Sequence, residues 1–173
     1  MKDLLWLDLE TTGLDPKYDD ILMVGVARTD EAGAIVQSKE WVVRSDVLNA
    51  DMPPEVLRMH TENGLLARVR STEAIPLFLV EEELLALIAG EKLTLAGNNI
   101  GFDRSFLKVQ MRVLYRALEY RTGDIRLLDV SMLRRAGRAW GVPERPKAKA
   151  HLALEDVKAS LAEFPYWKKA FGR

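Results

Sequence analysis

The stretch LLWLDLETTGLDP (residues 4–16) joins a strand to a tight turn, and it decides which fold the rest of the chain can form. Apolar side chains dominate Leu4–Leu9 in the alternating pattern of a strand, and the glycine and proline that follow predict a turn. Two further segments rich in β-forming residues, Ile21–Thr29 and Ala34–Val43, come next and are separated by a short polar turn. The three segments together predict a β-meander at the start of the chain.

Helices and two more strands are predicted for the remainder. The predicted helices run from Pro53 to His60, from Glu73 to Ala89 with Thr72 as cap, over Phe102–Glu119, from a Ser131 cap to Trp140, and from His151 to Phe171 with an interruption at Pro165. Short strands are predicted at Leu93–Ala96 and Arg126–Asp129, and a basic loop at residues 141–149. This order predicts an α/β fold in which a five-stranded mixed sheet, a three-strand meander plus two further strands, is flanked by helices. We expect residues 1–173 to form a single domain.

The composition restricts the chemistry that the chain can perform. It contains no cysteine, which excludes disulfides and thiolate metal sites, so a metal would be held by carboxylates or histidines. Oxygen ligands favour hard cations such as Mg²⁺ or Mn²⁺. The longest strongly apolar stretches fall short of about 18 residues, so no membrane span is expected. The first residues lack the pattern of a secretory signal, and we expect a cytoplasmic location.

Charge is spread unevenly along the chain, although the formal net charge is only -1. Between Arg104 and Lys149 there are twelve Lys and Arg residues against four Asp and Glu residues. Such an excess is typical of a phosphate-binding flank beside an acidic site, and it fits a solvated helix face equally well.

Acidic residues occur at three places where a metal site could form. Asp8 and Glu10 leave the same face of the first strand, just before a turn, although this spacing also occurs on ordinary exposed strands. Asp103 follows a glycine-containing loop and opens a helix, where a carboxylate also favours the helix dipole. His151 and Asp156 lie five residues apart at the last helix, which is also a common capping arrangement.

Taken in order, these three segments resemble the exonuclease motifs of the DEDDh family. The matching segments are DLETTGL (8–14), NNIGFD (98–103) and HLALED (151–156). The resemblance implies a ribonuclease H-like fold and 3′→5′ exonuclease activity with two divalent cations, Mg²⁺ or Mn²⁺. It also implies that Asp8, Glu10, Asp103 and Asp156 are metal ligands, and that His151 activates the attacking water.

Within that family the chain is similar to oligoribonucleases. The segments HTENGL (60–65), GNNIGFDRSFL (97–107) and LDVSML (128–133) carry this similarity. It implies that the substrate is short single-stranded RNA, that the protein is a homodimer, and that Leu14, His60, Arg126 and Ser131 bind the substrate. From the residues alone, His60 could equally be a histidine at a helix end, and Arg126 a cation at a strand edge.

Two aromatic positions of the oligoribonucleases are not aromatic here. The segment Met52–Val56 has no tryptophan, and Ile125 stands where a tyrosine often precedes the arginine. Because stacking on an aromatic ring is worth about 1–3 kcal/mol per base, a preference for dinucleotides does not follow from the sequence. An exonuclease for single-stranded DNA and a nucleic-acid-binding module with an inert site remain as alternatives. Trp140 fits a core position better than a subunit interface.

Overall fold

The structure is a computed structural model that describes residues 4–30, 32–47, 49–119, 125–144 and 151–172. The predicted basic loop 141–149 therefore lies partly outside the described residues. The strands are β1 (Leu4–Thr11), β2 (Ile21–Thr29), β3 (Ile35–Val42), β4 (Thr94–Gly97) and β5 (Leu127–Asp129). The helices are the 3₁₀ helix η1 (Asn49–Asp51) and α1 (Pro54–Glu62), α2 (Leu65–Val69), α3 (Leu77–Ile88), α4 (Ile100–Gln110), α5 (Arg112–Leu118), α6 (Val130–Ala139) and α7 (Ala153–Phe171).

The five strands form one mixed sheet in the order β3-β2-β1-β4-β5. Strand β1 pairs antiparallel with β2, and β2 pairs antiparallel with β3, which confirms the predicted meander. Strands β4 and β5 continue the sheet in parallel with β1. The carboxyl ends of β1, β4 and β5 therefore lie along one edge of the sheet, which is the edge that carries the acidic residues.

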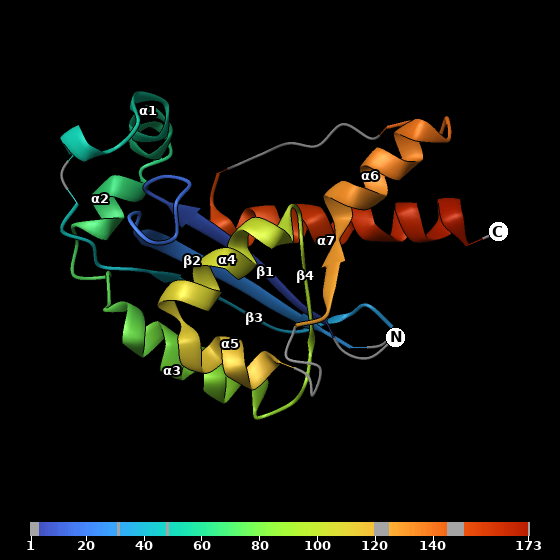
Figure 1. Ribbon diagram of the computed structural model, residues 1–173, viewed down its shortest axis with the longest axis horizontal. Coiled ribbons are helices and arrows are strands. Elements are labelled where there is room, and N and C mark those ends of the chain that lie inside the picture. The colour runs from blue at the N-terminus through green and yellow to red at the C-terminus, as the bar shows by residue number, and fades with distance from the viewer. Residues whose placement is uncertain (1–3, 31, 48, 120–124, 145–150, 173) are drawn as a thin grey trace.

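Helices cover both faces of the sheet, with α7 on one side and α3, α4 and α5 on the other (Figure 1). Successive side chains along β1 point alternately into the two packing layers on either face of the sheet. Leu5 and Leu7 belong to the layer under α3, α4 and α5, whereas Trp6 packs in the layer that includes Trp167 of α7. Asp8 and Glu10 have the same parity as Trp6, so they point to the α7 side of the sheet.

Two predicted helices begin or end differently in the structure. The helix predicted from Glu73 begins only at Leu77, because Ile75 pairs with the end of β3 and Pro76 directly precedes the first helical residue. Thr72 is therefore not its cap, and the short helix α2 was not predicted. The helix predicted over Phe102–Glu119 is two helices, α4 and α5, which meet at Met111 in a non-helical conformation.

Three further details of the prediction were wrong. The cap of α6 is Asp129, whose side chain accepts from the Ser131 N–H, because its carboxylate lies directly before the first turn. Helix α7 runs through Pro165 without a break, because the adjacent Phe164 packs against Trp6 of β1 with their ring centres 5.6 Å apart. Trp140 is 71% exposed and is not a core residue, because it lies just past the end of α6.

Over the described residues, no helix combines the length and apolar character that a membrane crossing requires.

Candidate active site

The end of β1 brings two carboxylates to one edge of the sheet. Glu10 is buried and Asp8 is half-buried, both on the face that α7 covers. The register of β1 against β2 shifts between Glu10 and Thr11, which is a β-bulge or a similar irregularity. Irregularities of this kind re-aim side chains at the ends of strands, and here the shift directly follows the second carboxylate.

Gly25 lets the start of α7 come close to these carboxylates. It pairs with Asp8 across β1 and β2. A Cβ atom at this position would lie 2.4 Å from the backbone carbon of Ala153 and from the backbone nitrogen of Leu154. Only glycine leaves room for that approach, so Gly25 decides how near the first turn of α7 lies to Asp8. No local pattern in the sequence indicates the importance of Gly25, since it depends on a neighbour 128 positions away.

His151 and Asp156 are joined by a local hydrogen bond at the start of α7. The His151 N–H donates to Asp156 Oδ2 over 3.1 Å, and His151 has a positive φ of 53°. His151 therefore precedes the helix, which begins at Ala153, and does not lie on it as predicted. Asn63, just after α1, donates its side-chain N–H to the His151 carbonyl oxygen. This bond joins the turn that contains His151 to the end of α1, a contact that no spacing in the sequence indicated.

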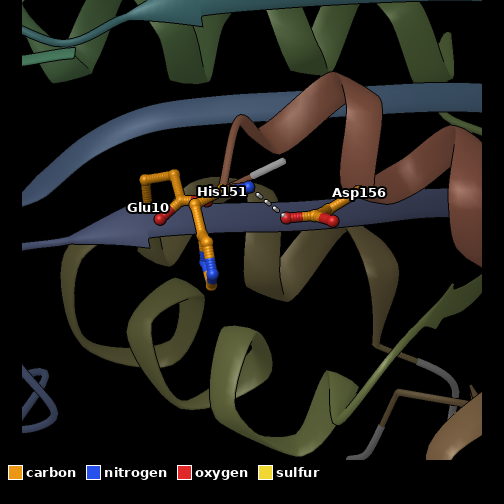
Figure 2. Close-up of side chains that lie close together, drawn as sticks. All are labelled: Glu10, His151 and Asp156. Carbon is orange, nitrogen blue, oxygen red and sulfur yellow. Dashed lines mark hydrogen bonds between the residues drawn. The ribbon is translucent and has the colours of Figure 1, made fainter. Parts of the chain in front are cut away.

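Three side chains from these two segments converge (Figure 2). One ligand atom from each of Glu10, His151 and Asp156 lies within 4.8 Å of the other two. Figure 2 shows Glu10 extending from β1, whereas Asp156 comes from the first turn of α7 and His151 from the residue pair before it. The structure thus brings together residues that are about 140 positions apart in the sequence.

Asp103 reaches the same edge from the other face of the sheet. Asn99, in a left-handed conformation, precedes α4, and Asp103 lies in the first turn of that helix. Its Oδ1 accepts a 2.9 Å hydrogen bond from the Leu9 N–H, so it contacts β1 between Asp8 and Glu10. Burial raises the pKa of Asp103 well above its usual range, and the nearby charge of Asp8 and then that of Glu10 raise it further, against hydrogen bonds that lower it. Three of the four predicted acidic ligands are therefore electrostatically coupled.

The residues fit a divalent cation. Asp156 Oδ1 is buried and has no hydrogen-bond partner among the described residues. A buried carboxylate oxygen without a donor is costly, and a cation removes that cost. Burial, then the charges of Asp8 and Glu10, raise the pKa of Asp103, and a cation at the cluster would oppose this effect. The candidate ligands are carboxylates, with one imidazole beside them, and carboxylate oxygens suit Mg²⁺ or Mn²⁺.

His60 is completely buried behind this cluster. Its Nε2 lies 3.0 Å from the Thr11 carbonyl oxygen and 4.0 Å from Glu10 Oε2. Burial lowers the pKa of His60, the Thr11 carbonyl raises it, and the charge of His151 lowers it. Because the ring has no exposed surface, it supports the end of β1 in this structure and does not face solvent.

The other predicted substrate-binding residues lie at two edges of the sheet. Leu14 is 81% exposed on the turn after β1, and Ser131 lies at the start of α6 beside Asp129, which also accepts from the Asn99 N–H over 3.0 Å. Both are at the edge that carries the carboxylates. Arg126 precedes β5, and its carbonyl oxygen accepts from Leu95. It therefore lies at the opposite end of the strands, and the structure does not bring it to the cluster.

Comparison with known proteins places this chain among nucleases. The model of a family described as exonuclease matches residues 5–164. The oligoribonuclease of Corynebacterium diphtheriae is 35% identical over 97% of this chain and 82% of its own length. The oligoribonuclease of Sodalis glossinidius is 36% identical over 99% of this chain and 96% of its own length.

Solved structures with a similar fold are longer exonucleases. A zinc-bound complex of Escherichia coli exonuclease I with single-stranded DNA superposes with a TM-score of 0.79 at 18% identity, covering 100% of this chain and 42% of that one. Exonuclease I from Methylocaldum szegediense gives a TM-score of 0.76 at 21% identity, again over 100% of this chain and 42% of the other. At these identities the likeness concerns the fold, which is the ribonuclease H-like fold expected from the sequence.

Proposed function

This chain belongs to the oligoribonuclease family of exonucleases, and from that membership we propose that it is a 3′→5′ exoribonuclease that degrades short RNA to mononucleotides. The observation that carries the proposal is the convergence of Glu10, His151 and Asp156 within 4.8 Å, with Asp103 coupled to the same cluster. Activity in this family depends on divalent metal ions. A cluster of buried carboxylates beside one histidine suits phosphodiester hydrolysis and has no purpose in a module that only binds nucleic acid.

Asp8, Glu10, Asp103 and Asp156 are the residues that would hold two cations, either Mg²⁺ or Mn²⁺. Two observations support this assignment: Asp156 Oδ1 is buried without a hydrogen-bond partner among the described residues, and the buried Asp103 carboxyl is close enough to Asp8 and Glu10 for their charges to raise its pKa further. When bound, a pair of such ions stabilises charge on the attacking and leaving oxygens at phosphorus. The protein contributes the fixed directions of its carboxylates, which come from β1, α4 and α7.

His151 is the proposed general base. A ring nitrogen of His151 accepts a proton from the water that attacks the phosphorus, a transfer suited to an imidazole near neutral pH. Two contacts hold the residue for this task, from its own N–H to Asp156 and from Asn63 to its carbonyl oxygen. These contacts fix the backbone of the turn and so restrict where the ring can lie.

Leu14 and Ser131 are proposed to contact the terminal nucleotides, since both lie at the edge of the sheet that carries the carboxylates. His60 is proposed to act at the same place by supporting Thr11 and Glu10, given its burial.

Arg126 is proposed to bind the substrate in the active site of the partner subunit of a homodimer. Its position at the far end of β5 supports this, because an arginine there is remote from the carboxylates of its own chain. Light scattering over a range of protein concentrations tests the dimer.

A cytoplasmic location remains part of the proposal, as does the assignment of all 173 residues to one exonuclease domain.

A timed digestion of labelled RNAs from two to twenty nucleotides, with Mg²⁺ and with Mn²⁺, tests the function. We expect the 5′-labelled strands to shorten one nucleotide at a time and the short strands to be consumed fastest. Single-stranded DNA of the same lengths is the comparison. Faster digestion of long DNA would establish a DNA exonuclease in place of an oligoribonuclease, and the absence of any metal-dependent hydrolysis would establish an inert binding module.

A further inference from the structure

The helical hairpin of α4 and α5 carries a basic groove on its outer surface. Lys108 of α4 and Arg112 and Arg116 of α5 line a cavity of about 280 Å³, together with Tyr115 and Glu119. The three cations are exposed; Lys108 lies in the last turn of α4, and Arg112 and Arg116 lie four residues apart on α5, close to one helical turn. All three belong to the excess of Lys and Arg over Asp and Glu between residues 104 and 149, and the binding of metal ions does not explain that excess.

The groove has few acidic groups to balance these charges. Within the described parts of the chain, Lys108, Arg112 and Arg116 form no ion pair, and Arg112 Nε donates only to the Val109 carbonyl oxygen at 3.2 Å. Glu119 lines one end of the groove.

The neighbouring Glu81 is an acidic residue of α3 whose side chain lies at the start of α5. Its Oε1 accepts from the N–H groups of Val113 and Leu114, at 2.8 and 2.9 Å, and so caps α5. These N–H groups are uncharged and leave the negative charge of Glu81 in place, so the three cations outnumber the two carboxylates, Glu81 and Glu119, by one. This excess of positive charge favours binding of a polyanion.

A continuous chain of contacts links the groove to the carboxylates. Arg104 directly follows Asp103 in α4, and its Nη2 donates to the Tyr115 hydroxyl over 3.1 Å. The Arg104 guanidinium carbon also lies 5.9 Å from the centre of the Tyr115 ring, which lines the groove. Lys108 is five residues beyond Asp103, or roughly 7.5 Å along the helix axis. Lys108 also lies about 140° around the helix axis from Asp103, so an RNA strand of several nucleotides with its end at Asp103 reaches Lys108 by curving around α4.

We propose that this groove binds the backbone phosphates of RNA upstream of the nucleotide being removed, so that it contributes to substrates of several nucleotides and not to dinucleotides. The inference rests on the proposed exonuclease activity and adds to it a determinant of substrate length. Phosphate contacts carry no base preference, so the groove would strengthen binding of all sequences alike. It would also compensate for the aromatic positions that this chain lacks near Glu55 and at Ile125.

The double variant Lys108→Ala/Arg116→Ala tests the proposal against the control Lys168→Ala/Lys169→Ala, which removes the same charge from exposed positions on α7. Arg112 is left intact because it bonds to the end of α4. We expect KM for a 12-nucleotide RNA to rise about fivefold in the first variant, with kcat unchanged and dinucleotide hydrolysis as in the wild type. The control should match the wild type on both substrates.

Fluorescence anisotropy of a labelled 12-nucleotide RNA in EDTA gives a readout without turnover. The slope of log binding constant against log salt should become shallower by about 1.4 in the first variant, since each lost contact with a single strand removes roughly 0.7. If KM and the salt slope were unchanged, or if KM for the dinucleotide rose equally, the proposed role of the groove would be contradicted. The exonuclease proposal would be unaffected. Failure of the wild type to hydrolyse either RNA would instead overturn the proposed function.

Discussion

Helix α7 buries two carboxylates that differ in how they are satisfied. Asp156 is 8% exposed and Glu163 is 7% exposed, and they lie about two turns apart on the same helix. Glu163 accepts 3.0 and 2.6 Å hydrogen bonds from Arg134 of α6 and a 2.7 Å bond from Trp167 Nε1. Asp156 accepts the His151 N–H through Oδ2, while its Oδ1 has no partner among the described residues.

Glu163 and Asp156 differ as a structural carboxylate differs from a carboxylate that lacks a compensating positive charge. The protein itself supplies the cation for Glu163, and the resulting bonds hold α6 against α7. At Asp156 the protein supplies other carboxylates in place of a cation, a combination that is unfavourable unless metal ions bind. Burial alone therefore does not identify a functional acid, whereas burial without a compensating donor does.

The largest expected effect is loss of activity in Asp156→Asn. The amide keeps the shape of the side chain and removes the charge that a cation requires, so we expect RNA hydrolysis to fall by roughly 10³-fold. Initial rates on a short labelled RNA measure this. Glu155→Gln is the control, because Glu155 is the exposed neighbour and pairs with Lys158 on the surface. Equal rates in Asp156→Asn and the wild type would remove Asp156 from the site.

The next effect is on stability, in Glu163→Gln. This change leaves Arg134 without a carboxylate in a largely buried pair, and we expect the free energy of unfolding to fall by about 3 kcal/mol. Urea denaturation measures the loss, and hydrolysis by the folded fraction should persist. Glu62→Gln, in an exposed pair with Arg58, should change stability far less. If Glu163→Gln lost activity and kept its stability, the contrast drawn between the two carboxylates would be wrong.

Metal binding should stabilise the wild type by about 2.7 kcal/mol for each bound ion when Mn²⁺ is present at a hundred times the dissociation constant of that site. The physical reason is that the ions bind the folded carboxylate cluster and not the unfolded chain. Thermal denaturation with Mn²⁺ and with EDTA gives the shift in Tm. At the same Mn²⁺ concentration we expect a smaller shift in Asp156→Asn and the full shift in Glu163→Gln. A full shift in Asp156→Asn would mean that the ions bind elsewhere.

The smallest effect is the pH dependence of stability in EDTA. Because the pKa of Asp103 is raised in the folded state, the folded protein holds a proton that the unfolded chain has lost. Stability should therefore fall as pH rises from the usual range of an aspartate to the raised pKa, by at most about 1.4 kcal/mol per pH unit for this group. Urea midpoints across that range measure the slope, and Asp103→Asn should flatten it. A slope that is the same in both proteins would assign the dependence to other groups.

Much of the fold and of the candidate site could be predicted because the signals are local. The alternation in Leu4–Leu9, the boundaries of β2 at Ile21–Thr29 and the acidic motifs all depend on neighbouring residues, and the structure contains the strands at those places. The details that were wrong depend on remote contacts. Ile75 bonds to the end of β3 instead of joining α3, and Trp140 is exposed past the end of α6.

The sequence by itself determined which segments form strands and helices and which residue types are available for metal and proton chemistry, since periodicity and side-chain chemistry are properties of the chain taken in order. Only the tertiary structure decided that Asp103 bonds to the Leu9 N–H, that Gly25 admits the start of α7, and that Arg126 lies at the far end of its strand. The order of the strands and the close packing of helices on them set these distances, and both arise from contacts between residues that the sequence holds far apart.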